Sequence, residues 1–146
     1  MSALEVFNFA DFGSMTHHIE ALGAAPLAGV EKHVYVIEVG NVGVKVGITE
    51  QPRKRIQAHA RAARAHGHEL GRIAVTEACE NARANERELI ALGGDGNRSE
   101  YLSLDFDVVL AAMRSLVIER ADAEWHAARA EGVKNLFANL LFGGAR

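Results

Sequence analysis

The sequence predicts an α+β protein in which a small mixed or antiparallel β-sheet of about three strands is flanked by helices. Two segments rich in β-branched residues are separated by a short turn, and a third such segment lies between two helix-forming stretches. Hydrophobic residues make up 49% of the 146-residue chain and charged residues 24%. A chain of this length and composition can bury a core of its own, which excludes global disorder.

The first half of the predicted order is strand, strand, helix. Residues 33–39 (HVYVIEV) and 44–49 (VKVGIT) are strand-forming, and the intervening GNVG supplies a turn, so we expect a hairpin. The alanine-rich stretch that follows begins with Pro52, a residue suited to a first helical turn, and predicts a helix to about His66.

The second half continues with a strand, a helix, a short strand and further helices. Residues 70–76 (LGRIAVT) predict the third strand, residues 77–92 a helix, and residues 99–104 (SEYLSL) a brief strand or extended piece. A long helical pattern runs from 107 to about 130, and an amphipathic segment at 133–142 follows. We therefore expect an N-terminal helix or loop extension at 1–32, a core at 33–104, and a C-terminal helical extension at 105–146 packed on that core.

Charge is unevenly distributed along the chain. The formal net charge is -3, but the segment 51–72 holds six cationic residues against one acid, Glu69. This asymmetry favours a local anion-binding face. Cys79 is the only cysteine, which excludes an intramolecular disulfide, and no apolar run approaches the roughly 20 residues of a membrane span. We expect a soluble, cytoplasmic protein without a membrane partner.

Several positions of the hairpin and first helix match a known pattern. Tyr35 lies between two valines on the first strand, a Lys-Val-Gly triplet occupies 45–47, and Arg55 follows Gly47 by eight residues with His59 four further on. This arrangement resembles the GIY-YIG nuclease superfamily, in the small phage and bacterial branch with a Lys-Ile-Gly-like second motif. His33 stands where the family has its first glycine, and Lys45 where it has its second tyrosine.

The resemblance extends into the second half of the core. Glu86 lies in a Glu-x-x-Leu helical context like that of the family's metal-binding glutamate, and SEYLSL is similar to the segment that ends the family's core. The resemblance therefore covers roughly half of the chain and implies a GIY-YIG-like fold.

The resemblance implies metal-dependent hydrolysis of a phosphodiester. Glu86 would hold a divalent metal, Mg²⁺ or Mn²⁺, and Arg55 would bind phosphate oxygens with its fork of donors. Tyr35 would receive the proton of the attacking water or orient it, and we expect Lys45 and Arg55 to favour its phenolate form. His59 is an alternative acceptor of that proton, since an unperturbed imidazole titrates near neutrality.

Four further cations on the first helix are candidates for binding the nucleic-acid backbone: Arg53, Lys54, Arg61 and Arg64. We expect DNA rather than RNA as the partner, and a monomer or a homodimer formed through the C-terminal helices.

Other interpretations of the same residues stay open. Tyr35 would be an ordinary core aromatic, Lys45, Arg55 and Glu86 solvated charges, and the four further cations a soluble helix surface. In that case the chain would be a catalytically impaired GIY-YIG-fold module that binds nucleic acid or another protein.

Overall fold

The structure, a computed structural model, describes residues 4–10, 15–94 and 96–142 and contains a five-stranded antiparallel sheet. The strands lie in the order β1-β4-β2-β3-β5. Their bounds are Leu4–Asn8 for β1, His33–Val39 for β2, Gly43–Thr49 for β3, Leu70–Thr76 for β4 and Tyr101–Leu102 for β5. The helices are α1 (Met15–Glu20), α2 (Pro52–Ala65), α3 (Ala82–Ile90), the short 3-10 helix η2 (Ala91–Gly93), α4 (Phe106–Arg114) and α5 (Ala123–Leu141).

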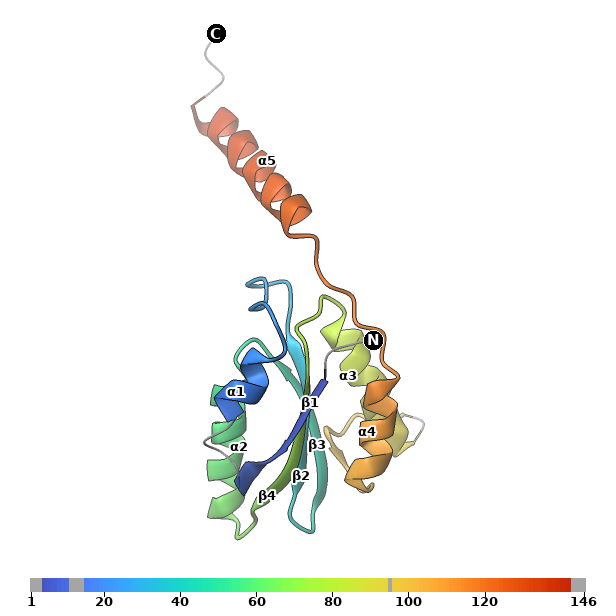
Figure 1. Cartoon of the computed structure of the whole chain (residues 1–146). Coiled ribbons are helices and arrows are strands. Elements are labelled where there is room, and N and C mark those ends of the chain that lie inside the picture. Colours follow the sequence, from blue (N-terminus) through green and yellow to red (C-terminus); the bar gives the residue numbers. More distant parts are fainter. Residues whose placement is uncertain (1–3, 11–14, 95, 143–146) are drawn as a thin grey trace.

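Helices cover both faces of the sheet. Figure 1 shows α1 and α2 on one face, and α3 and α4 on the other. Alternate residues of β2 enter the two cores: Tyr35 and Ile37 pack toward Ile56 of α2, whereas Val34 and Val36 join the core that contains residues of α3 and α4. Because both faces are covered, β2 is buried at six of its seven positions rather than at alternate ones.

The α+β class is confirmed, and so are the strands at 33–39 and 70–76 and the hairpin between β2 and β3. The expected number of about three strands is too low. The brief strand at β5 pairs with β3, and β1 adds a further edge strand. The prediction of a helix or loop for the opening stretch is therefore wrong for Leu4–Asn8, because pairing with the distant β4 decides the conformation of this five-residue segment.

The long helix expected from 107 to about 130 is interrupted between α4 and α5. The residues after α4 are held by Asn81, whose side-chain nitrogen donates to the carbonyl of Val117 at 2.8 Å and whose side-chain oxygen accepts from the amide of Glu119 at 3.1 Å. The amide of Glu80 also donates to the carbonyl of Glu119 at 2.7 Å. These contacts with a distant segment replace the hydrogen bonds that a continuous helix would form.

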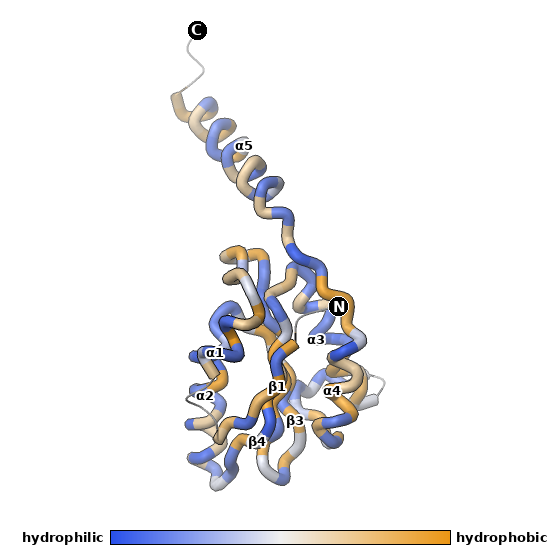
Figure 2. The backbone as a smooth tube through the Cα atoms, viewed as in Figure 1, coloured by the Kyte–Doolittle hydropathy of each residue, from blue (hydrophilic) through white to orange (hydrophobic). Residues whose placement is uncertain are grey.

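The two helices of the C-terminal extension differ in burial. Phe106, Val109 and Met113 of α4 are buried, whereas α5 has no buried residue. Figure 1 shows α5 projecting away from the sheet, and Figure 2 shows that hydrophilic and hydrophobic positions are mixed along it. Among the described residues, no helix combines the length and the apolar character needed to cross a bilayer.

Glu31 connects the turn before β2 with the segment that leads to α5. Its carboxylate accepts hydrogen bonds from the amides of Leu27 and Ala121, both at 2.9 Å, and from Nε and Nη2 of Arg120 at 2.7 and 3.1 Å. The Arg120 guanidinium is the main reason that the pKa of Glu31 falls to about 2. The ionised carboxylate therefore stabilises the folded state.

We expect Glu31→Gln to lower the free energy of unfolding by about 1–3 kcal/mol at neutral pH, because the buried side chain loses the charge that binds Arg120 and two backbone amides. The folded-state pKa lies below the unfolded one, so this contribution is complete above pH 4.5 and is lost as the pH falls toward 2. Urea unfolding at neutral and acidic pH measures both effects. The exposed Glu20→Gln serves as control, and equal stability of the two variants at neutral pH would contradict the assignment.

Candidate active site

Tyr35 lies on the α2 face of the sheet, directly opposite Gly47 of β3. The side chain is 1% exposed and its ring crosses the glycine: a Cβ added at position 47 would lie 2.2 Å from the phenolic oxygen. No side chain at position 47 can share this space with the ring. The glycine thus lets the phenol extend across β3.

The phenol of Tyr35 is hydrogen-bonded to His59 of α2. The distance between the phenolic oxygen and Nε2 is 2.8 Å, and the two ring centroids lie 5.6 Å apart. Arg55 and His59 are four residues apart on α2, so their side chains leave the same face of the helix. The contact therefore joins a strand and a helix through two residues that the sequence marked as candidates.

Electrostatics favour the neutral forms of both groups. Burial raises the pKa of Tyr35 above its ordinary value, and the charge of Arg55 opposes this effect without overcoming it. Burial, and then the charges of Lys45 and Arg55, lower the pKa of His59 to about 4. Arg55 favours the phenolate, as expected, but desolvation of the buried phenol outweighs its effect, so the phenol stays protonated. A neutral imidazole beside a protonated phenol can accept its proton.

Lys45 enters the same region from β3 and pairs with a residue that the sequence had not marked. Lys45 as a whole residue is 7% exposed. Its ammonium group forms an ion pair with Glu100 and lies 4.9 Å from the ring centroid of Tyr101. Lys45 holds the pKa of Glu100 below its ordinary value. The sequence offered only the place of Glu100 within the segment SEYLSL, directly before β5, and its partner on β3 lies 55 residues away.

Arg55 is exposed and borders a concave surface beside the Tyr35–His59 pair. This surface is lined by Lys32, Lys54 and Arg55, together with Thr49, Glu50 and nearby residues. Three cations against one carboxylate make it suited to an anion such as phosphate. Of the four backbone-binding candidates, the structure brings Lys54 next to the site.

The other three cations lie elsewhere on α2. Arg53, Arg61 and Arg64 are exposed, and their spacing of eight and three residues places them on one side of the helix. Arg64 lines a separate cavity with Ala60, His68 and Glu69. These three residues do not surround Tyr35, but they could contact the phosphates of a long nucleic-acid strand.

Glu86 approaches the cluster from α3, on the other side of β3. It is partly buried, and burial followed by the charge of Glu100 raises its pKa, while Lys45 opposes the rise. Glu86 in turn belongs to the charges that raise the pKa of Tyr35. The carboxylate is therefore electrostatically coupled to the site, but it lines neither the Arg55 surface nor the pocket beside His59.

The carboxylates near the site could supply only part of the coordination of a divalent ion. After burial, the charge of the neighbouring Glu100 makes ionisation of Glu86 less favourable. A bound cation would relieve this repulsion between the two carboxylates. The described part of the chain contains no group of three or more His, Cys, Asp or Glu side chains arranged around one point. Because Mg²⁺ can use one or two protein carboxylates and keep several waters, such an ion would need the substrate to complete its coordination.

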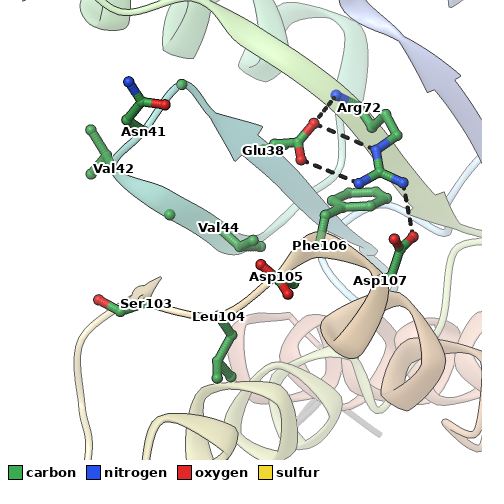
Figure 3. A pocket seen from close by; sticks show the side chains of 12 residues that line it. Glu38, Asn41, Val42, Val44, Arg72, Ser103, Leu104, Asp105, Phe106 and Asp107 are labelled. Carbon is green, nitrogen blue, oxygen red and sulfur yellow. Dashed lines mark hydrogen bonds and ion pairs between the residues drawn. The ribbon is translucent and has the colours of Figure 1, made fainter.

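A further cavity on the opposite face of the sheet is distinct from this cluster. Figure 3 shows Arg72 clamped between Glu38 and Asp107 above the ring of Phe106. The guanidinium donates to Asp107 at 2.8 Å and to Glu38 at 3.3 and 3.5 Å, and its carbon lies 4.6 Å from the ring centroid. Since two carboxylates already engage this arginine, the cavity offers less to an anion than the Arg55 surface does.

Comparison of the chain with protein-family models, with curated proteins and with solved structures finds no match.

The state of Tyr35 can be measured directly, since the chain has two tyrosines and Tyr101→Phe leaves Tyr35 alone. We expect ultraviolet absorbance during alkaline titration to show that Tyr35 ionises above the ordinary phenol value of about 10. The same variant in denaturant serves as control, because the exposed phenol should return to that value. Ionisation of the folded variant below pH 10 would contradict the burial argument.

Proposed function

We propose that the chain is a nuclease that hydrolyses phosphodiester bonds of nucleic acid, DNA in the first place, with the help of Mg²⁺ or Mn²⁺. The single observation that carries the proposal is the hydrogen bond between Tyr35 and His59, with Lys45 and Arg55 close enough to depress the pKa of that imidazole. A buried phenol, a neutral base and two cations around one point are the groups that attack on a phosphate ester requires.

In the proposed reaction Arg55 binds the non-bridging oxygens of the phosphate. Its planar fork matches phosphate geometry, and Lys32 and Lys54 add positive charge on the same surface. Negative charge brought by the phosphate offsets the effect of Lys45 and Arg55 on His59 and raises the pKa of the imidazole from about 4 toward neutrality. Substrate binding would thus make His59 a stronger base.

Tyr35 then acts as a relay rather than as a preformed phenolate. The attacking water gives a proton to the phenolic oxygen while the phenol gives its own proton to Nε2 of His59, so the phenol remains neutral throughout. The buried position of Tyr35 favours this route, because it disfavours a free phenolate. Lys45 is positioned by Glu100 beside the same site.

Glu86, with Glu100 as a second carboxylate nearby, would hold the divalent ion. When bound, the ion would neutralise charge on the phosphate and assist departure of the leaving oxygen. The pairing of Glu100 with Lys45 leaves Glu86 as the first candidate for this role.

A non-cleaving nucleic-acid-binding module is the second candidate. One observation favours it: the ammonium group of Lys45 is already paired with Glu100. Such a module would bind through the same cations, and its affinity would fall steeply with salt. A protein-interaction role would instead use the exposed apolar residues of α5.

We expect purified protein to cut plasmid DNA with Mg²⁺ or Mn²⁺, and Glu86→Gln to slow cutting by about a hundredfold or more, because charge stabilisation at the phosphate is lost. Gel assays of plasmid cleavage over a series of metals measure this rate. Glu88→Gln, two residues away on α3 and exposed, is the matched control and should cut like the parent chain. Equal cutting by both variants would remove Glu86 from the site, and salt-sensitive binding without product under any metal would favour the binding module.

A further inference from the structure

A mainly apolar pocket borders the candidate active site on the side away from the Arg55 surface. Its volume is about 490 Å³, within the usual range for small-ligand sites. Its walls come from α2, the end of the β2–β3 hairpin, the turn after α2 and β5. The lining residues are Val39, Val42, Lys45, His59, Ala62, Ala63, His66, His68 and Tyr101.

One wall is a continuous face of α2. His59, Ala62, Ala63 and His66 follow the spacing i, i+3, i+4 and i+7, which places them in one row along the helix. The two alanines give a low apolar surface between two imidazoles. A flat ligand with polar edges fits such a wall, because its faces meet methyl groups while its edges reach ring nitrogens.

The opposite wall offers an aromatic ring. Tyr101 pairs with Lys45 across β5 and β3, so both side chains project from the same face of the sheet. The ring of Tyr101 is 47% exposed, although the next residue, Leu102, is buried in the core. An exposed aromatic that lines a pocket beside cationic groups is a typical platform for a stacked nucleobase.

The pocket and the candidate active site share two residues. His59 contributes to the pocket wall and is hydrogen-bonded to Tyr35, and Lys45 contributes to the wall and pairs with Glu100. The cationic Arg55 surface lies on the other side of the same pair. A nucleic-acid strand whose phosphate lies at Arg55 would therefore bring a neighbouring base to the pocket.

We propose that this pocket receives one unpaired nucleobase next to the scissile phosphate, stacked on Tyr101, so that the preferred substrate is single-stranded or locally unpaired nucleic acid. The inference rests on the proposed function for the position of the phosphate. A base inside a duplex is stacked on its neighbours and cannot enter a pocket without being unpaired and extruded.

The test measures binding of the full chain to a short fluorescent single-stranded oligonucleotide by anisotropy, with a chelator present so that no cleavage occurs. Base stacking contributes about 1–3 kcal/mol per base, so Tyr101→Ala should raise Kd by between about fivefold and a hundredfold. Tyr101→Phe keeps the ring and should stay within about twofold of the parent chain. A parent-like Kd for Tyr101→Ala would overturn the proposal.

Trp125→Ala provides a matched control. Trp125 is an exposed aromatic, 52% accessible, with Arg129 5.3 Å from its ring centroid, but it lies on α5. Its replacement should leave Kd unchanged. Equal weakening by Trp125→Ala and Tyr101→Ala would show general aromatic contact with the strand and would overturn the assignment to the pocket.

An abasic scan of the oligonucleotide tests whether one base is involved. In the parent chain one abasic position should cost as much affinity as Tyr101→Ala does, and in Tyr101→Ala the same position should cost nothing further. Additive losses would overturn the proposed contact. A free nucleoside monophosphate should compete weakly, because it lacks the strand, and competition as tight as that of the oligonucleotide would assign the pocket to free nucleotides instead.

The outcomes separate this inference from the proposed hydrolysis. Glu86-dependent cleavage combined with binding that ignores Tyr101 would refute the base pocket and leave the nuclease proposal intact. Binding that depends on Tyr101 with no cleavage under any metal would support the pocket and refute the nuclease.

Discussion

The candidate site depends on the absence of a side chain at position 47. Because β2 and β3 pair with Tyr35 opposite Gly47, the phenol can lie across β3 and reach His59 on α2. A methyl group at this position would occupy the place of the phenolic oxygen. The hairpin register and one glycine therefore determine where the phenol and the imidazole meet, and the positions of Lys45 and Arg55 relative to them follow from the same register and the same helix.

Burial and charge then set the chemistry of the pair. The sheet is covered on both faces, so Tyr35 is desolvated, and desolvation outweighs the attraction of Arg55 for a phenolate. Burial, and then the charges of Lys45 and Arg55, keep His59 neutral while no anion is bound. Without an anion, the site therefore places positive charge beside a neutral imidazole. A bound phosphate would offset that positive charge. This coupling between anion binding and proton affinity is the physical basis of the proposed relay.

Much of the central fold could be predicted from sequence, because the hairpin, α2 and β4 have strong local signals. The strand-forming runs and turn residues of 33–49 identify β2 and β3, and the resemblance carried by Tyr35, Gly47, Arg55 and His59 implied a common site, in which the structure shows the Tyr35–His59 contact. Edge strand β1 and the break between α4 and α5 could not be predicted, since distant partners decide both. Glu100 was missed for the same reason, as its importance comes from an ion pair with Lys45 across 55 positions of sequence. The net rise in the pKa of Tyr35 could not be predicted, because sequence reveals nearby charges such as Arg55 more readily than burial.

We propose that one phosphate contacts Arg55 and the Tyr35–His59 pair, and that Glu86 would hold a divalent ion. The most direct measurement is a crystal structure of the chain with Mn²⁺ and a phosphorothioate oligonucleotide that resists hydrolysis, with manganese located by its anomalous scattering. We expect a manganese peak at the Glu86 carboxylate, and a phosphate that contacts the Arg55 guanidinium and the phenol of Tyr35. Manganese bound away from Glu86, or a phosphate that occupies the exposed side of α2 without contacting Arg55 and Tyr35, would contradict it.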